Sequence, residues 1–154
     1  MGGELVRALA KAGEPVRGLV RGGRAGSLPA GAEAATGDLN QPASLRDALR
    51  GVTGVFLLPG YQDMPGVLAD AGRSGARRVE LLSGSSAADG DMSNAITRYM
   101  VVSEAAVRDS GILWTILRPS GFASNALQWA PQLRAGDVER APFGGVRGGG
   151  HRPL

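Results

Sequence analysis

Apolar residues recur along the chain in short blocks, and the blocks alternate between two kinds of spacing. Apolar residues three or four positions apart predict helices with one buried face, whereas short continuous apolar runs predict strands buried on both faces. Helices are predicted over residues 4–12, 40–51, 66–74, 93–109 and 122–133. Strands are predicted over residues 16–20, 33–36, 52–58, 78–82 and 112–117. The small and polar residues 84–92 predict a loop.

Strands that alternate with helices indicate parallel pairing through right-handed crossovers. The predicted fold class is therefore α/β, with a doubly wound parallel sheet. Such a domain normally begins with a strand, a glycine-rich turn and a helix. Here Gly2 and Gly3 directly precede the first predicted helix. We therefore expect the sheet to lack its first strand.

The first strand is central in a doubly wound sheet, so its loss has a structural consequence. It would leave a gap between the strands predicted at residues 16–20 and 52–58. Either these two strands pair directly, or another segment fills the gap, or the fold is only marginally stable. The residues after Gly144 show no periodicity. The expected organisation is one incomplete domain over residues 1–143 and an irregular tail over residues 144–154.

Composition excludes several classes of protein. The 154 residues are 43% hydrophobic and 20% charged, which is typical of one globular domain. The net charge of +3 comes from scattered arginines without a basic stripe, so we expect no nucleic-acid partner. There is no cysteine and therefore no disulfide. No apolar run approaches the ~20 residues that span a bilayer, and the first residues lack a signal-peptide pattern, so a soluble cytoplasmic protein is expected.

Several short motifs follow one another in a characteristic order. They are Gly2-Gly3-Glu4-Leu5-Val6-Arg7-Ala8-Leu9, Gly18-Leu19-Val20-Arg21, Thr36-Gly37-Asp38-Leu39, Val55-Phe56-Leu57-Leu58-Pro59, Leu81-Leu82-Ser83, Trp114-Thr115-Ile116-Leu117-Arg118-Pro119-Ser120-Gly121-Phe122, Asn125 and Gly136-Asp137. The series, over about residues 2–143, resembles the NmrA-like proteins, which are atypical short-chain dehydrogenases that bind NAD(P) on a Rossmann-like fold. Against that family the chain is expected to be truncated at its start and aberrant at its end.

The resemblance implies an NAD(P)H-dependent reductase of small molecules such as quinones. Two alternatives stay open: a non-catalytic dinucleotide-binding redox sensor or regulator, and a gene fragment without function. Because the cofactor carries the hydride chemistry, such a reductase needs little acid–base machinery of its own. A small-molecule substrate is expected and the oligomeric state is left open.

Arg21 is the candidate that selects the cofactor. An acidic residue at the end of this strand would bind the ribose 2′-hydroxyl of NAD, whereas an arginine accommodates the 2′-phosphate of NADP. NADP(H) is therefore expected in preference to NAD(H), with Arg24 as an assisting residue; the alternative is an exposed arginine at a strand end. Gly2 and Gly3 lie where a helix N-terminus would attract the pyrophosphate.

The resemblance assigns the other candidates by their place after each strand. It implies that Asp38 contacts the adenine, although a turn aspartate that caps the next segment is an equal alternative. Because ligands bind outside the carboxyl ends of such strands, the backbone of Leu58 and Pro59 is also expected to contact the dinucleotide; a plain loop start is the alternative. Further candidates lie beside the nicotinamide and substrate, namely Ser83, Arg118, Phe122 and Asn125. The alternatives are that Arg118 forms a structural ion pair and that Phe122 packs in the core.

Ser83 and Tyr99 are the two candidate catalytic residues. Ser83 resembles the serine that orients the substrate carbonyl in short-chain dehydrogenases. In those enzymes a lysine four residues after the tyrosine lowers the pKa of the tyrosine, so that it acts as an acid. Here that position is Ser103, and the family's other lysine position is Met100. Tyr99 is therefore a weak candidate for a general acid. No cluster has the spacing of metal ligands, so no metal is expected.

Overall fold

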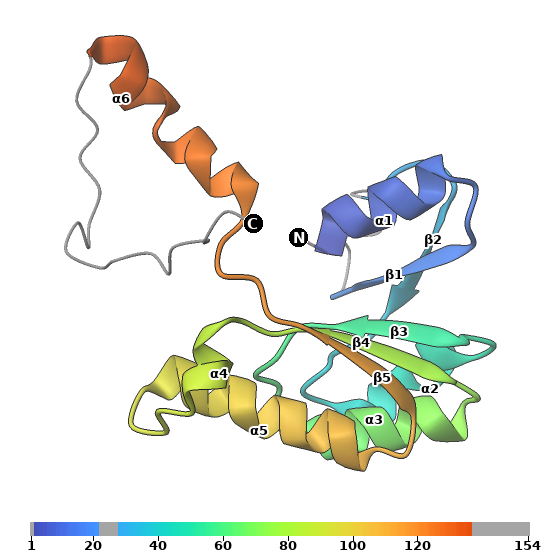
Figure 1. The fold of residues 1–154 in the computed structure, drawn as a ribbon. Coiled ribbons are helices and arrows are strands. Elements are labelled where there is room, and N and C mark those ends of the chain that lie inside the picture. Colours follow the sequence, from blue (N-terminus) through green and yellow to red (C-terminus); the bar gives the residue numbers. More distant parts are fainter. Residues whose placement is uncertain (1, 22–27, 137–154) are drawn as a thin grey trace, which may run out of the picture. The chain divides into compact units, whose positions relative to one another are not determined.

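The computed structural model describes residues 2–21 and 28–136 (Figure 1). It divides into two compact units, residues 1–120 and residues 121–154. The α-helices are α1 (Gly2–Lys11), α2 (Arg46–Leu49), α3 (Met64–Arg73), α4 (Ser86–Asp89), α5 (Ala95–Asp109) and α6 (Ala130–Ala135). The 3₁₀ helices are η2 (Pro42–Leu45) and η3 (Ala123–Gln128). The strands are β1 (Val16–Val20), β2 (Ala32–Thr36), β3 (Gly54–Leu57), β4 (Arg78–Leu82) and β5 (Leu113–Leu117).

All strand pairs in the described residues are parallel, and they form two separate sheets. One sheet pairs β1 with β2, with Val16 opposite Ala32. The other has the order β3-β4-β5, with Leu57 opposite Leu81. The predicted α/β fold with parallel strands is confirmed. The strands at residues 16–20 and 52–58 do not pair with each other. This excludes direct pairing, the first of the three outcomes expected for the gap between them.

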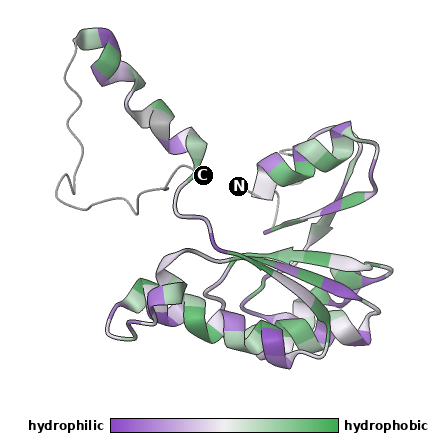
Figure 2. Ribbon diagram, in the orientation of Figure 1, coloured by the Kyte–Doolittle hydropathy of each residue, from purple (hydrophilic) through white to green (hydrophobic). Residues whose placement is uncertain are grey.

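The core lies on one face of the three-stranded sheet. Helices α3 and α5 run side by side along this face (Figure 1). The buried cluster consists of Leu45, Leu49, Leu57, Met64, Val67, Leu68, Ala71, Ala76, Val79, Leu81, Val107 and Ile112. Hydrophobic and hydrophilic residues alternate along α5 (Figure 2), as expected for a helix with one buried face. No residue of α1, β1 or β2 belongs to this cluster.

Helix α1 packs on β1 and β2, but its apolar side chains are less buried than its sequence predicts. Its apolar face contains Leu5, Val6 and Leu9, but none of its residues is fully buried. The Arg17 guanidinium holds this sheet to α2, because it donates to the carbonyls of Ala48 and Arg50 at 2.7 and 2.8 Å. A cation is favourable at the carbonyl end of a helix.

One predicted loop, two predicted helices and one predicted strand differ from the structure. The loop over residues 84–92 contains the one-turn helix α4, since small residues such as Ala87 can pack closely. The helix predicted over 40–51 begins as η2 and continues as α2; Pro42 is its first residue, where the missing N–H costs nothing. The helix predicted over 122–133 is divided into η3 and α6. Strand β3 is also shorter than residues 52–58.

Two local features begin the helices of the core. Asn94 caps α5, and its side chain accepts hydrogen bonds from the N–H groups of Ile96 and Thr97 at 2.9 and 3.2 Å. Asp63 caps α3 in the same way by accepting from Gly66. These caps satisfy helix N–H groups that have no partner within the helix. Within the described ranges no helix is both long enough and apolar enough to cross a membrane.

Candidate functional site

The candidate residues follow the carboxyl ends of the strands. Arg21 follows β1, Leu58 and Pro59 follow β3, Ser83 follows β4, and Arg118 follows β5. In open α/β sheets ligands bind outside these strand ends. The backbone joins two of the ends directly, because the N–H of Ser83 donates to the carbonyl of Leu117 at 2.8 Å. The structure therefore brings Ser83 and Arg118 together at one edge of the three-stranded sheet.

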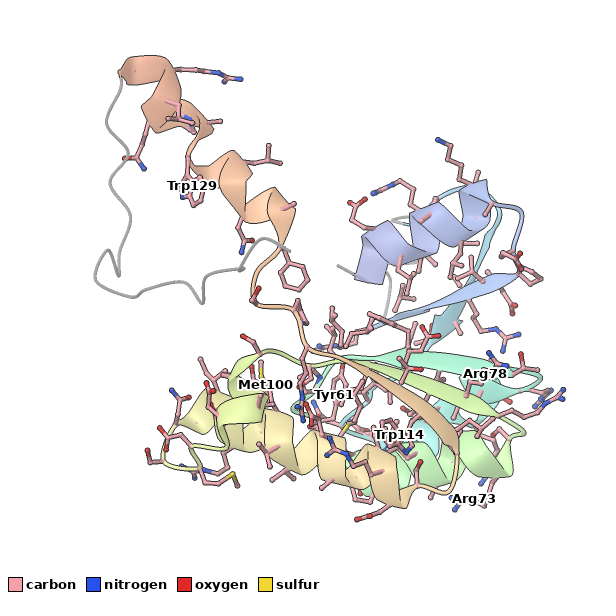
Figure 3. All side chains as sticks on the ribbon, viewed as in Figure 1. Tyr61, Arg73, Arg78, Met100, Trp114 and Trp129 are labelled. Atoms are coloured by element: carbon pink, nitrogen blue, oxygen red, sulfur yellow. The ribbon has the colours of Figure 1, made fainter. Side chains whose placement is uncertain are left out.

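Arg118 forms an ion pair with a buried carboxylate near this edge, as the alternative interpretation of Arg118 supposed; its partner, Glu104, was not among the predicted residues. The carboxylate of Glu104, in α5, is 1% exposed. It accepts from Nε and Nη2 of Arg118 at 2.8 and 2.5 Å, and from Nη2 of Arg108 at 2.8 Å. The Arg108 guanidinium also lies 5.7 Å from the centre of the Trp114 ring, labelled in Figure 3. The four-residue spacing of Glu104 and Arg108 signalled one of these bonds in the sequence.

The Glu104 carboxylate is held in its charged form. Hydrogen bonds from Arg118 are the main cause, and together with smaller effects of Ser83 and Arg108 they outweigh burial, so that the pKa of Glu104 falls from 4.5 to about 2. The same bonds raise the pKa of Arg118. The guanidinium of Arg118 is thus committed to a structural ion pair, and any contact of Arg118 with a ligand would use the part that remains exposed.

Ser83 carries a buried hydroxyl without an ordinary hydrogen bond. Its side chain is enclosed, and its Oγ has no partner of normal bonding geometry among the described residues. It still lies close enough to the Glu104 carboxylate to help lower its pKa. Buried polar groups are nearly always paired, and the Glu104 carboxylate is the partner within reach of this hydroxyl.

Arg21 and Tyr61 lie near each other at the ends of β1 and β3. Burial raises the pKa of Tyr61, and the positive charge of Arg21 acts in the opposite direction. Tyr61 is half-buried and packs against the core (Figure 3). Arg21 is exposed and makes no ion pair within the described part of the chain. Its guanidinium is therefore available to an anion. Tyr61 was not among the predicted site residues.

Tyr99 lies beside the loop that follows β3. It is 41% exposed, and a β-carbon added at Gly60 would lie 3.3 Å from Cδ2 of its ring. Gly60 also has φ of 97°, which favours glycine. Ser103, where the resemblance implies lysine, accepts from the N–H of Gly60 at 3.0 Å and donates to the Tyr99 carbonyl at 2.7 Å. Ser103 thus connects α5 to this loop and supplies no charge to Tyr99.

Met100 occupies the other position where the resemblance implies lysine. Its thioether lies 3.5 Å from Oγ of Ser86, and its terminal carbon is 2.9 Å from where a β-carbon at Gly84 would be. Figure 3 shows Met100 on α5 at the end of the helix near α4. Met100 therefore packs against Ser86 and Gly84. Neither of the two positions where the resemblance implies a lysine beside Tyr99 carries a cation.

Replacing Ser103 with alanine is expected to lower the free energy of unfolding by about 1 kcal/mol. The variant leaves the N–H of Gly60 without its partner, which costs about 1–3 kcal/mol, and the better helix propensity of alanine returns about 0.5 kcal/mol. Urea unfolding would measure the change, with Ser85→Ala as the matched control, because Ser85 is exposed and its side chain makes no capping hydrogen bond. Faster hydrogen exchange at the Gly60 amide would localise the effect, and equal stability of both variants would contradict it.

Asp38 forms a turn after β2. Its carboxylate accepts from the N–H of Asn40 at 2.9 Å, and its own N–H donates to Oγ of Ser44 at 2.9 Å. The side chain of Asn40 in turn accepts from the N–H of Gln62 at 3.3 Å, which joins the loops after β2 and β3. Asp38 thus shapes the turn, as the second interpretation supposed, and its contact with an adenine stays a prediction.

The remaining candidates lie in α1, in the second unit or outside the described residues. Gly2 and Gly3 begin α1, are exposed, and have open space where a side chain would be. Phe122 and Asn125 belong to the second unit, where the N–H of Asn125 donates to the carbonyl of Phe122 at 2.8 Å. Arg24 and the tail over residues 144–154 lie outside the described residues.

The described residues fit a dinucleotide. The first turn of α1 offers unhindered N–H groups, which suit a pyrophosphate. Arg21 offers an uncommitted cation, and the buried hydroxyl of Ser83 lacks a partner within the described part of the chain. These groups lie on elements whose order is that of a doubly wound domain.

Comparison with known proteins gives the same result. A family model described as NAD(P)H-binding matches residues 1–142. A (4-alkanoyl-5-oxo-2,5-dihydrofuran-3-yl)methyl phosphate reductase of Streptomyces griseus is 41% identical over 148 residues, and an NAD(P)H azoreductase of Xenophilus azovorans is 33% identical over 150 residues. Each alignment covers 94% of this chain and 52% of the relative. The chain therefore spans about half the length of the curated relatives it matches.

A solved structure shows the same fold. The NADPH-dependent quinone oxidoreductase of Escherichia coli, complexed with NADPH, matches with a TM-score of 0.69 and 24% identity, over 86% of this chain and 50% of that one. At this identity the likeness establishes the architecture alone. The match of the family model over nearly all residues establishes the family, and the chain belongs to the NAD(P)H-binding family.

Proposed function

We propose that this chain is the dinucleotide-binding part of a reductase that uses NADPH to reduce a small molecule such as a quinone. The observation that carries the proposal is the exposed guanidinium of Arg21 at the end of β1, which makes no ion pair with the described residues, in a chain of the NAD(P)H-binding family. The relatives support the class of reaction, because their names describe reductases of an organic phosphate ester and of azo compounds.

Arg21 would supply the preference for NADPH. A guanidinium binds a phosphate through two parallel charge-assisted hydrogen bonds, which a ribose hydroxyl cannot match. The half-buried Tyr61 beside it offers an apolar surface for the adenosine part of the cofactor. The first turn of α1, with Gly2 and Gly3, would hold the pyrophosphate through backbone N–H groups.

The strand ends would position the reacting groups. A bound nicotinamide supplies the hydride, so the protein has to bind, orient and exclude water. The backbone of Leu58 and Pro59 follows β3 at this edge, and the Ser83 hydroxyl, which lies beside the Glu104 carboxylate, would have to turn outward to donate a hydrogen bond to a substrate carbonyl. Tyr99 has neither lysine of the typical pattern, which favours a site that works by positioning over one that depends on a tyrosine acid.

Titrating the 154-residue chain with NADPH and with NADH tests the proposal. Calorimetry should show one site with NADPH bound at least tenfold tighter, since a charge-assisted contact contributes about 1.5–3 kcal/mol. The melting temperature should rise with NADPH, because a ligand at 100 times its Kd adds about 2.7 kcal/mol. Oxidation of bound NADPH on adding a quinone would identify a reductase, and binding without oxidation a sensor. Binding of neither nucleotide would overturn the proposal.

A further inference from the structure

A small pocket lies between η2, α2 and α3, which pack against one another. Its volume is about 470 Å³, and it is lined by Ala43, Arg46, Asp70, Arg73 and Ser74. The first two residues belong to η2 and α2, and the other three to the last turn of α3 and its C-cap. None of the five belongs to the strand ends at which the cofactor is expected, so this pocket, which we call the helix pocket, is a separate feature.

The core fixes both walls of the helix pocket. Leu45 and Leu49 lie on one wall element, Leu68 and Ala71 on the other, and all four belong to the buried cluster. Ser74 ends α3 shortly before β4 begins, so this part of the pocket lies toward the amino edge of the sheet. Side chains that project from packed helices are held more precisely than side chains on loops. The helix pocket therefore presents its polar groups in a defined arrangement.

The helix pocket offers hydrogen-bond donors that lack acceptors within the described part of the chain. Arg46 is exposed, and its guanidinium makes no hydrogen bond or ion pair there. Arg73, labelled in Figure 3, donates through Nη2 to Oδ1 of Asp70, which leaves its other N–H groups available. The Ser74 hydroxyl also makes no bond to a described residue. Two guanidinium groups and one carboxylate leave one positive charge, which favours a small anion.

Asp70 determines which anion fits. Its side chain is 22% exposed, and its Oδ2 has no donor among the described residues. Sulfate offers only acceptor oxygens, so this carboxylate would repel it. Hydrogen phosphate keeps one hydroxyl at neutral pH, and this hydroxyl can donate a charge-assisted hydrogen bond to the carboxylate. The helix pocket therefore combines donors for the oxygens of phosphate with an acceptor for its hydroxyl.

We propose that the helix pocket binds inorganic phosphate in the form of hydrogen phosphate. Arg46 and Arg73 donate to the phosphate oxygens from the two walls, because the planar guanidinium group matches the geometry of phosphate. Ser74 donates a further bond, and Asp70 accepts from the phosphate hydroxyl. The bound ion joins α2 to α3, so it stabilises the folded chain. The site is independent of the proposed reductase function, since it shares no residue with the cofactor site.

Amide NMR of the full 154-residue chain at pH 8 tests the proposal. Inorganic phosphate should give saturable shifts in residues 43–47 and 70–75. It should bind at least about tenfold tighter than sulfate at equal ionic strength, because repulsion replaces a charge-assisted hydrogen bond. Glycerol 3-phosphate, a monoester that has lost its phosphate hydroxyl at this pH, should bind as weakly as sulfate.

Three results of this titration would overturn the proposal. Absence of saturable shifts in the helix pocket would show that it holds no phosphate. Shifts confined to α1 and Arg21 would place the ion in the cofactor site. Binding of sulfate or of glycerol 3-phosphate as tightly as phosphate would show an adventitious ion only.

Variants assign the roles of the lining residues. Arg46→Gln removes an exposed cation and should weaken phosphate binding about tenfold. Arg77→Gln is the matched control, because Arg77 is also exposed, carries the same charge and does not line the helix pocket. Asp70→Asn should abolish the preference for phosphate over sulfate, since an amide can donate to either anion. Arg73→Gln repeats the test on the other wall if Asp70→Asn fails to fold, as judged by circular dichroism. Equal losses in Arg46→Gln and Arg77→Gln, or an unchanged preference in Asp70→Asn, would overturn the proposal.

Discussion

Replacing Glu104 with glutamine is expected to lower the free energy of unfolding by about 2–3 kcal/mol at pH 7. The carboxylate is 1% exposed and accepts three charge-assisted hydrogen bonds from Arg118 and Arg108. Glutamine keeps the volume but offers one acceptor oxygen and no charge. Breaking a fully buried pair costs about 3–5 kcal/mol, and here both arginine side chains reach solvent, which moderates the loss.

The same carboxylate makes the free energy of unfolding depend on pH in the acidic range. Its pKa is about 2 in the folded protein, below the 4.5 of an ordinary glutamate, chiefly through its bonds with Arg118. The contribution is therefore complete above pH 4.5 and is lost as the pH falls toward 2. The full shift corresponds to about 3 kcal/mol, which screening at the exposed arginines reduces to about 2 kcal/mol.

Urea unfolding of both proteins at pH 7, 4.5 and 3 would measure this contribution. The wild-type chain should lose stability more steeply between pH 4.5 and 3 than Glu104→Gln, so the two should converge in acid. Glu4→Gln is the matched control, because Glu4 pairs with Arg7 on the surface of α1 and is largely exposed. An equal effect of both substitutions would show that the buried ion pair does not stabilise the fold.

The strands were predictable because their signals are local. Apolar runs between glycine and polar residues mark β1 and β4 with the bounds that the structure shows. Helix α4 was missed, because its four residues are small and carry no apolar period. The division at Trp129 between η3 and α6 was missed as well, since the apolar spacing continues across it.

The candidate site was predictable in its location and less so in its contacts. That Arg21, Ser83 and Arg118 follow strands can be inferred from the sequence, because parallel strands present their carboxyl ends on one edge. The ion pair of Arg118 with Glu104 joins residues 14 positions apart through the packing of α5 on β5. The bond from Gly60 to Ser103 spans 43 positions. No local pattern encodes such distances, so only the folded chain brings these partners together.

The gap between β1 and β3 combines both situations. The absence of direct pairing between β1 and β3 was one of the outcomes left open by the sequence. The structure adds the reason why the sheet does not simply close. Arg17 fixes β1 through the carbonyls of α2, and α1 covers β1 and β2, so that sheet is held by its own contacts.

Replacing Arg21 with glutamate is expected to reverse or abolish the preference for NADPH over NADH. Loss of the charge-assisted contacts to the 2′-phosphate costs about 1.5–3 kcal/mol, so the Kd for NADPH should rise about 10- to 100-fold. Repulsion between carboxylate and phosphate acts in the same direction. The affinity for NADH should be retained or improve, since a carboxylate at this strand end accepts hydrogen bonds from the ribose hydroxyls.

Arg78→Glu is the matched control for this substitution. It changes the charge equally, but Arg78 begins β4 and so lies at the amino edge of the sheet, away from the strand ends that would hold the cofactor (Figure 3). Calorimetric titration of the wild-type chain and both variants with both nucleotides separates a local contact from the effect of net charge. A similar fall in NADPH affinity for both variants would mean that the protein's overall charge attracts the phosphate. If the ratio of the affinities for NADPH and NADH were unchanged in Arg21→Glu, Arg21 would not be part of the cofactor site. The proposal that the chain binds a dinucleotide would still stand.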